Sequence, residues 1–215
     1  MKMKICLAIV SIGLLMFSHE ACGAFSELSG EVMFDESQVN IGGAALGDHF
    51  RIIRFHGCAD SPDYSLNLVL GYGFNPDLSA GEYSYQDLAY YLGIRMYNSD
   101  LMEATVIMGG YNKSVYEDVD MGGYYVRNNL AYSRGILIGF SQSFFLSERF
   151  SINGTYYGSF PYVRYDSTIE RWELSGELKL EGGGFFTAGF NTDKFYQAVQ
   201  ISKVRGFYIG MGKRF

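Results

Sequence analysis

The sequence predicts an all-β fold, an antiparallel up-and-down transmembrane β-barrel of ten strands. Three observations predict it. The end of the chain alternates between apolar and small or polar residues, several internal segments do the same, and the composition is typical of strands. Of the 215 residues, 17% are aromatic and 27 are glycine, against only 3 prolines. This mixture suits strands with aromatic belts and small interior residues better than it suits helices.

The last segment, 207–215, has the clearest meaning. Its outward set under strict alternation is Phe207, Ile209, Met211, Lys213 and Phe215, with glycines, Tyr208 and Arg214 between them. In a soluble protein an apolar strand at the end of the chain would expose an edge that aggregates. A closed barrel in a membrane removes the edge and uses the apolar face. We therefore expect this strand to pair with the first one, near 26–34.

The other end of the chain has the features of a secretory signal peptide. Lys2 and Lys4 precede an apolar run of about 13 residues, which is shorter than the roughly 20 that a transmembrane helix needs. The segment 21–24 resembles a cleavage site, so we expect a signal peptide over 1–24 and the barrel over 25–215. An uncleaved anchor and a lipid-modified Cys22 are the alternatives, although no aliphatic residue lies three positions before Cys22.

The internal strands follow from alternation, taken in order along the chain. The segment 171–181 is the clearest, because Trp172 and Leu174 fall on one face while Arg171 and Glu173 fall on the other. A helix would distribute these charges around its circumference. The predicted strands are 26–34, 50–57, 64–74, 88–97, 101–111, 130–144, 150–160, 171–181, 184–191 and the final strand, of which 50–57 and 184–191 have the weakest alternation.

Connections between these strands alternate in length. Short polar turns are predicted at 58–62, 98–100, 146–148 and 181–184, and long loops at 35–49, 75–85, 112–124, 161–169 and 191–204. Periplasmic turns and extracellular loops alternate in this way. The pattern predicts ten strands with both ends of the chain in the periplasm, and eight strands with longer loops is the alternative. A soluble lipocalin-like barrel would also alternate, but with its apolar face inward.

Charged residues on the inward faces are the candidate site. They are Glu31, Arg95, Arg171, Glu173, Glu177 and Lys179, and the inward faces also carry Glu27 and Asp87. One interpretation is that opposite charges pair and fill the lumen, and the other is that they line a narrow polar pathway for small solutes. A barrel of eight or ten strands has little interior volume left once side chains fill it, which favours the first interpretation.

No residue pattern indicates an enzyme or a cofactor. The predicted mature chain has only His49 and His56, with no G-x-S-x-G motif and no serine at a matching spacing. Omptin proteases are ten-stranded barrels that use an Asp pair and an Asp-His dyad, and only Asp48 followed by His49 hints at that arrangement. The two histidines, one cysteine and scattered carboxylates of the predicted mature chain show no metal-ligand spacing. The acidic segment 117–120 lacks the calcium-loop pattern. Cys58 has no partner for an internal disulfide, and the net charge of −6 gives no reason to expect nucleic acid as a partner.

The ending Gly210-Met-Gly-Lys-Arg-Phe215 is similar to the close of the outer-membrane protein A and X type of barrel domain. The resemblance implies that the barrel-assembly machinery recognises the last strand, with Phe207, Ile209, Met211 and Phe215 as the assembly signal. Lys213 departs from the apolar residue usual there, and near lipid headgroups it can extend to water. Length, signal peptide and ending are also similar to the accessory colonization factor A family of an enteric pathogen, which implies a virulence-associated barrel used in host colonisation.

These observations predict a non-enzymatic protein of the cell outer membrane, in contact with outer-membrane lipid. Its extracellular loops, which contain exposed tyrosines beside Asn and Gly as in Tyr111-Asn112 and Tyr124-Tyr125, are expected to mediate surface interaction in adhesion or colonisation, with host surface molecules as partners. The alternative function is a narrow channel or transporter for small solutes.

Overall fold

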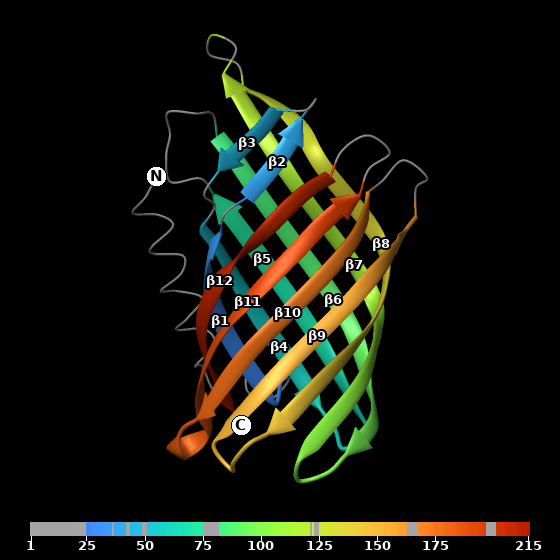
Figure 1. Ribbon diagram of the computed structural model, residues 1–215, viewed down its shortest axis with the longest axis vertical. Helices are drawn as coiled ribbons and strands as arrows, with labels where there is room; N and C mark the ends of the chain where they lie inside the picture. Colours follow the sequence, from blue (N-terminus) through green and yellow to red (C-terminus); the bar gives the residue numbers. More distant parts are fainter. Residues whose placement is uncertain are drawn as a thin grey trace.

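The computed structural model describes residues 25–35, 37–41, 44–48, 51–74, 82–120, 122, 125–162, 167–196 and 201–215. The predicted signal peptide, Cys22 and His49 lie outside these residues. Nearly all of the described residues are in strands, which run obliquely around a single barrel (Figure 1). The elements are β1 (Glu27–Asp35), β2 (Ser37–Ile41), β3 (Ala44–Asp48), β4 (Arg51–Asp60), β5 (Tyr64–Phe74), β6 (Glu82–Asn98), β7 (Met102–Asp120), β8 (Tyr125–Phe145), β9 (Phe150–Pro161), β10 (Thr168–Lys179), the short 3-10 helix η2 (Glu181–Gly183), β11 (Gly184–Tyr196) and β12 (Ile201–Arg214).

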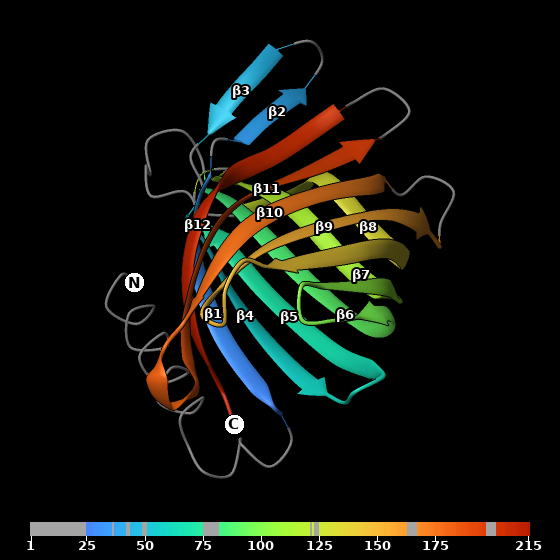
Figure 2. The ribbon, with the colours of Figure 1, turned by 60° about the horizontal axis from the view of Figure 1, so that its bottom comes forward.

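The barrel is closed by pairing between its first and last strands. The described strands form one twelve-stranded sheet in which β1 and β4 to β12 follow one another in order and β12 pairs back with β1. That pairing is antiparallel and runs from Glu27 opposite Arg214 to Asp35 opposite Gly206. The remaining two strands, β2 and β3, form a hairpin outside the ring (Figure 2). The predicted ten-stranded barrel and its closing pair are thus confirmed, and the alternative of eight strands is wrong.

The strands at the turn end match the predicted positions closely. β5 coincides with the predicted 64–74, and the two weakest predictions, 50–57 and 184–191, are β4 and β11. All four short turns lie within a residue or two of the predicted sites. In the last of them Gly182 and Gly183 have φ values of 79° and 82°, a left-handed conformation that glycine adopts at no steric cost. Both ends of the barrel-forming chain lie at this end.

At the other end the predicted loops are too long, because the strands continue. β7 reaches Asp120 and β8 begins at Tyr125, so that most of the predicted loop 112–124 is strand. In the same way β11 and β12 extend through much of the predicted loop 191–204. The alternation of apolar and polar residues fades there because the inward residues Asn191 and Asp193 are polar although buried, and the outward Lys194 is polar as well, while backbone pairing goes on. Hydrophobic pattern therefore marks the apolar part of a strand and not its full length.

The hairpin of β2 and β3 lies within the predicted loop 35–49. β2 pairs with β12 through Val39 opposite Ser202 and Gln38 opposite Lys203. Figure 1 shows this hairpin, together with the connected ends of β7 and β8, beyond the rim of the barrel. The long-connection end of the molecule is therefore a strand-built extension, whereas the opposite end is closed by short turns.

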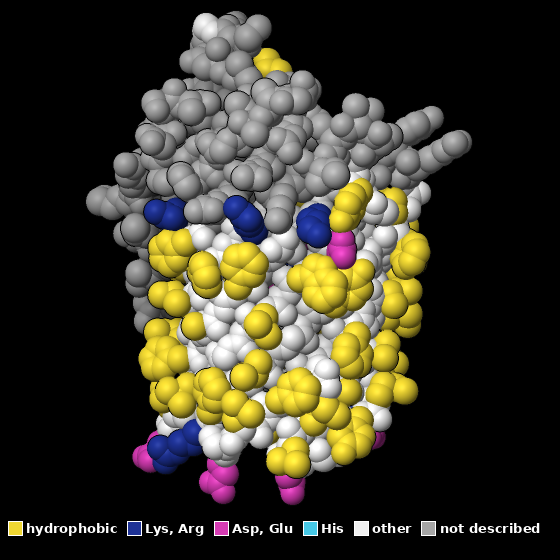
Figure 3. Space-filling view, in the orientation of Figure 1, with side chains coloured by type: hydrophobic (Ala, Val, Ile, Leu, Met, Phe, Trp, Pro, Cys, Tyr) yellow, Lys and Arg dark blue, Asp and Glu magenta, His cyan; other side chains and the backbone are white. Residues whose placement is uncertain are grey.

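The outer wall is apolar and the inner face is polar or tightly packed. Along β10, the outward residues Trp172 and Leu174 are 52% and 60% exposed, while the inward residue Arg171 of the same strand is only 4% exposed. Figure 3 shows the resulting band of hydrophobic side chains around the barrel. A soluble lipocalin-like barrel has the opposite arrangement, so that alternative does not describe this protein. Among the described residues, no helix is long and apolar enough to cross a membrane.

The exposed wall leads to a first prediction. Leu174 lies in the middle of β10 and faces outward, so Leu174→Arg should destabilise the protein folded in phospholipid vesicles by about 2–4 kcal/mol. The matched control is Leu101→Arg, which changes an exposed leucine in a short turn and should cost only about 0–1 kcal/mol. Urea unfolding in vesicles measures both. Equal effects of the two variants would contradict burial of the wall in hydrocarbon.

Candidate functional site: a charged layer that fills the lumen

The six charged residues of the predicted candidate site lie at three different heights. Glu31 and Arg171 are buried at mid-barrel, 6% and 4% exposed, and Glu173 lies next to them on β10. Arg95 and Glu177 lie toward the turn end and make ion pairs there. Lys179 lies at that rim, with its ammonium 5.4 Å from the ring centre of Phe145. The structure therefore separates the predicted set into a central group and a group at the rim.

The central group belongs to a larger cluster, which we call the central charge layer. It consists of three cations and three carboxylates that come from six different strands, and all six side chains are buried. The members are Glu31 (β1), Arg54 (β4), Asp87 (β6), Lys113 (β7), Arg171 (β10) and Asp193 (β11). Because these strands are distributed around the ring, the layer extends across the lumen and not along one wall.

The pair of Lys113 and Asp193 shows this most directly. The two residues are 80 positions apart in sequence, on β7 and β11, which are separated by three strands in the shorter direction around the ring. Nevertheless Lys113 Nζ donates to Asp193 Oδ2 at 3.1 Å and lies 3.4 Å from Asp87 Oδ2, and all three side chains are 0% exposed. A contact of this length between distant strands can form only through the middle of the barrel.

Arg54 joins the other carboxylates to the same centre. Its guanidinium lies 3.3 Å from Glu31 Oε1, 3.4 Å from Asp87 Oδ2 and 3.7 Å from Asp193 Oδ2. With its amide oxygen turned toward the guanidinium groups, Asn191 accepts from Arg54 at 2.5 Å and from Arg171 at 2.9 Å. The planar fork of arginine suits several acceptors at once, which explains why guanidinium groups connect this layer.

Arg171 continues the network toward the turn end. Its Nη2 donates to Glu173 Oε2 at 2.7 Å, and Glu173 Oε1 accepts from Tyr208 Oη at 2.8 Å. His56 Nε2 lies 3.3 Å from Glu31 Oε1. The Tyr157 ring lies beside both cations of this region, 5.4 Å from Lys113 Nζ and 5.8 Å from the guanidinium carbon of Arg171. The layer is thus held to β4, β9 and β12 by groups that flank it.

The charges of the central layer balance, three positive against three negative. Isolated buried charges would be very costly, but paired and hydrogen-bonded ones are tolerated. Removing one partner leaves its neighbours uncompensated, which is why such a layer constrains the whole barrel. The geometry therefore gives the lumen a polar centre in which buried charged side chains from six strands meet.

An apolar cap covers this layer on the side of the long connections. One inward position beyond the charges, five strands contribute side chains that are 1% exposed or less, namely Met33, Ile52, Ile169, Phe195 and Val204. These residues belong to the continuous cluster of buried apolar side chains in the barrel. The sequence predicted charged side chains that fill the lumen and did not predict this apolar cap. An ion that entered the apolar cap would lose its hydration water, so the cap and the central charge layer together oppose the passage of ions.

Ion pairs at the turn end hold the rim together. Arg214 lies 2.7 Å from both Glu27 on β1 and Glu177 on β10, so the last strand is joined by charge to strands on either side of the closing seam. Arg95 lies 2.6 Å from Asp60 and 3.1 Å from Glu103, and it also donates to the carbonyl of Ser61. These pairs are partly exposed, so they position the rim more than they stabilise it.

Three members of the central charge layer were not predicted to face the lumen, for identifiable reasons. Lys113 and Asp193 fall inside the predicted loops 112–124 and 191–204, and Arg54 lies in a strand with weak alternation. A signal was present in the chain, since Lys113 continues the inward set of Ile107 and Tyr111 at period two, and Asp193 continues that of Asn191.

The described residues contain no grouping of three or more His, Cys, Asp and Glu that could hold a metal ion. His56 is paired with Glu31, and Cys58 is a free cysteine on β4. Asp48 ends β3, but its side chain and all of His49 lie outside what the structure describes. The similarity of Asp48-His49 to the Asp-His dyad of omptin proteases therefore stays a sequence-based observation.

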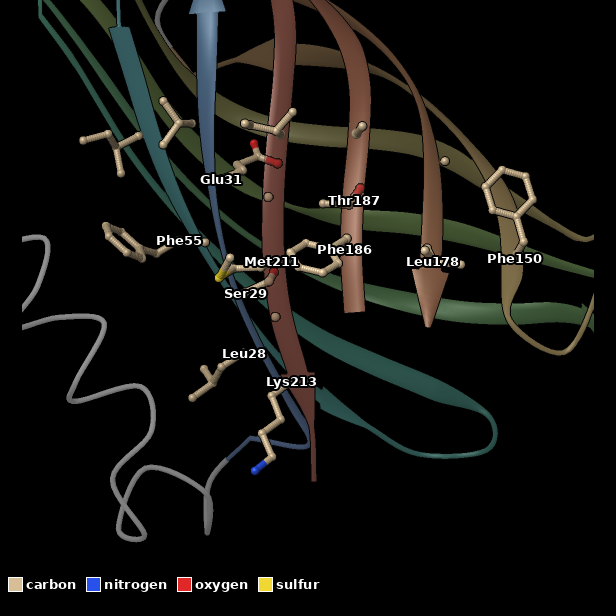
Figure 4. Close-up of a pocket in the computed structure, with 18 residues that line it drawn as sticks. Leu28, Ser29, Glu31, Phe55, Phe150, Leu178, Phe186, Thr187, Met211 and Lys213 are labelled. Atoms are coloured by element: carbon tan, nitrogen blue, oxygen red, sulfur yellow. The ribbon is translucent and has the colours of Figure 1, made fainter. Parts of the chain in front are cut away.

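A groove of about 890 Å³ in the outer wall is a second concave feature (Figure 4). It extends from β4 across β1, β12, β11 and β10 to the first residue of β9, and most of its lining is apolar. Phe55, Phe150, Leu178, Phe186 and Met211 line it, with Lys213 at its edge near the turns. It opens outward on the apolar band and offers a place for hydrocarbon, and the polar residues of its lining are Ser29, Glu31, Thr187 and Lys213.

An apolar outer wall, a closed antiparallel ring and a filled lumen define the protein as a small up-and-down barrel of the transmembrane kind. Solved structures with this fold include the outer membrane protease OmpT from Escherichia coli, with a TM-score of 0.51 and 10% identity over 88% of this chain and 96% of that chain. Neisserial surface protein A matches with a TM-score of 0.46 and 7% identity, covering 88% and 96%. Ail, the attachment invasion locus protein of Yersinia pestis, matches with 0.44 and 13%, covering 89% and 99%.

At such identities these likenesses concern the fold alone. No family model matches the chain, and no curated protein matches it. The likeness to OmpT extends over nearly the full length of both chains, which agrees with the ten-stranded ring.

A double-mutant cycle tests the cross-lumen pair. Lys113→Met should cost about 3–5 kcal/mol, because it leaves buried Asp193 and Asp87 with less compensation. The double variant with Asp193→Leu should cost clearly less than the sum of the two single changes. Unfolding followed by fluorescence of Trp172, the only tryptophan, gives the coupling.

The matched control pair is Arg149 and Glu181, which lie 3.2 Å apart with side chains 69% and 88% exposed. Arg149→Met and Glu181→Leu should show a coupling below about 1 kcal/mol. A coupling between Lys113 and Asp193 no larger than that of the control pair would contradict a dry charged layer.

Proposed function

We propose that the protein spans the outer membrane of a Gram-negative bacterium as a non-enzymatic β-barrel. The apolar band supports a bilayer location, and closure through β1 and β12 leaves no unpaired edge there. Short turns at one end and long connections at the other support the usual orientation, with the turns in the periplasm. In this arrangement the outward residues of β12, Phe207, Ile209, Met211 and Phe215, serve as the signal for the barrel-assembly machinery.

We further propose that its extracellular end mediates surface interaction in adhesion or host colonisation. The observation that carries this proposal is the set of buried side chains that meet across the lumen. The central charge layer and the apolar cap occupy the lumen, which does not favour transport of a solute through the barrel. We therefore assign the function to the extension beyond the membrane. That extension consists of the β2–β3 hairpin and the outer parts of β7 and β8. Similarity of the ending to the accessory colonization factor A family points in the same direction.

A narrow channel is the competing function, and the lumen does not favour it. Lys113 and Asp193 meet in the middle of the barrel, and side chains at most 1% exposed lie directly beyond them. An enzyme is not favoured either, because His56, the histidine that the described residues include, lies 3.3 Å from Glu31 within the charged interior.

Purified protein in a planar bilayer should therefore give no stepwise ion conductance. The buried layer would have to separate before an ion could pass, and each uncompensated charge is costly. The heat-modifiable gel shift typical of folded barrels controls for correct folding. Discrete openings in the wild type, lost on charge changes at Glu177 or Arg95, would contradict the proposal and favour the channel.

Adherence of bacteria to cultured host cells tests the extracellular role. Replacing residues 37–48, or residues 117–128 of the β7–β8 hairpin, by a short Gly-Ser turn should remove most of the binding without affecting assembly. The control replaces the turn 146–149 at the opposite end in the same way. Outer-membrane fractionation verifies equal amounts of each variant. Full adherence by both extracellular variants, or a wild-type protein found soluble in the periplasm, would contradict the proposal.

A further inference from the structure

The groove in the outer wall has a floor of small residues at the closing seam of the barrel. Gly30 of β1, Gly176 of β10 and Ala188 of β11 line it on the outward faces of their strands. A Cβ atom at Gly30 would lie 3.6 Å from the ring of Phe55, and one at Gly176 would lie 3.4 Å from the ring of Phe150. Two aromatic rings therefore flank the floor, and Figure 4 shows them on its two sides.

Large apolar side chains stand around this floor and remain exposed. Phe186, Ile209 and Met211 line the groove and are 47%, 59% and 57% exposed. The volume of about 890 Å³ lies within the range of roughly 300–1,000 Å³ that is usual for ligand sites. An occupant of this groove therefore has to be apolar along most of its length.

The groove lies in the half of the wall next to the short turns. Its lining on β12 extends from Ile209 to Lys213, and β12 ends at Arg214. Four residues of strand extend over about 13 Å, whereas the hydrocarbon core of a bilayer is roughly 30 Å thick. Because the strands of a barrel are tilted, the height along the membrane normal is smaller still. The groove therefore belongs to a single leaflet, the one at the turn end.

Lys213 is the polar side chain that borders this groove on the outside. The other polar residues of the lining are Ser29, Glu31 and Thr187, which alternate to the inward faces of their strands. Lys213 alternates to the outward face, and Figure 4 shows its ammonium extending away from the ribbon, below the apolar side chains and toward the turns. A cation thus lies at the end of an apolar groove, where lipid headgroups begin.

Within the part of the chain that the structure describes, no carboxylate lies within ion-pair distance of Lys213. Its ammonium lies 5.5 Å from the ring centre of Phe215. In the register Lys213 lies opposite Leu28 of β1 and Gly184 of β11, which carry no charge. The next residue, Arg214, differs because two carboxylates already pair with it. The ammonium of Lys213 is therefore available to an anion.

We propose that the groove and Lys213 together bind one anionic phospholipid of the turn-side leaflet. Its acyl chains occupy the apolar groove, and the phosphate of its headgroup pairs with the Lys213 ammonium. A headgroup without an ammonium of its own suits this single cation best. Because the groove crosses the pairing of β1 with β12, the lipid contacts both strands that close the ring. This inference rests on the membrane placement under the proposed function and adds to it a lipid site and its class of ligand.

Native mass spectrometry of the folded protein in detergent micelles, with phosphatidylglycerol added stepwise, measures this site. Wild type should bind one phosphatidylglycerol before others attach. Lys213→Gln should weaken this first binding about fivefold, which is the factor that one basic group contributes near anionic lipid. Phosphatidylethanolamine with the same chains should bind wild type more weakly than phosphatidylglycerol does. The matched control, Arg149→Gln, changes an exposed cation paired with Glu181 and should bind as wild type does.

A second pair of variants tests the groove itself. Gly176→Leu fills the floor and should weaken the first binding about tenfold or more, because each methylene kept out of apolar contact corresponds to roughly fourfold. Gly158→Leu makes the same change at an outward glycine that does not line the groove and whose Cβ would lie 3.9 Å from Tyr156 Oη. It should bind as wild type does. The heat-modifiable gel shift verifies folding, and Ala188→Leu takes the place of Gly176→Leu if that variant does not fold.

Each result separates one occupant from another. Equal binding by wild type, Lys213→Gln and Gly176→Leu overturns the site. Weaker binding by Gly176→Leu alone, with equal binding of the two lipids to wild type, overturns recognition of the headgroup. A dimer that both changes abolish, in place of bound lipid, identifies a second copy of the chain as the occupant and also overturns the proposal. Failure of the wild type to insert into phospholipid vesicles overturns the proposed membrane placement instead.

Discussion

Pairing of β12 with β1 is the constraint on which the rest of the structure depends. A wall that faces hydrocarbon can leave no backbone N–H or C=O group without a partner, so the ring must close. In a closed ring the number of strands sets the width of the lumen, and a ring of ten strands leaves a space that side chains can fill. The charge pairs of Arg214 with Glu27 and Glu177 lie where the seam ends, so they support the pairing at its most exposed point.

A lumen of this width explains the central charge layer. Inward positions cannot all be apolar, because the chain would then be hydrophobic on both faces and would aggregate before insertion. Charged side chains keep one face of each strand soluble, and they become tolerable inside the barrel only as a balanced set. Arg54, Lys113 and Arg171 against Glu31, Asp87 and Asp193 form such a set. The charged residues that keep the unfolded strands soluble thus also occupy the lumen of the folded barrel.

How far the sequence could predict the structure depends on where each residue lies relative to the apolar band. Within the band, alternation gave the position and facing of strands such as 64–74 and 171–181, since one face met hydrocarbon and the other the lumen. Beyond the band the inward faces of β7 and β11 carry buried charged residues and the outward faces are no longer apolar, so the period of two continues without the contrast between apolar and polar residues that reveals it. Lys113 and Asp193 lie near this boundary and were assigned to loops. Their contact across the lumen depends on the ring geometry, which no local pattern contains.

The two ends of the barrel differ in a way that assigns them different tasks. At the turn end the connections are short, the rim is held by Arg95 and Arg214, and the exposed charges are mainly acidic. At the other end the strands extend beyond the apolar band and the β2–β3 hairpin pairs with β12. Most of the charged side chains at the upper border of the band are Lys or Arg, as Figure 3 shows. A barrel that only sealed a membrane would need neither the extension nor the basic border. Under the proposed function, the buried charges between the two ends leave binding by the extension to the outer side, and the wall holds that extension above the lipid.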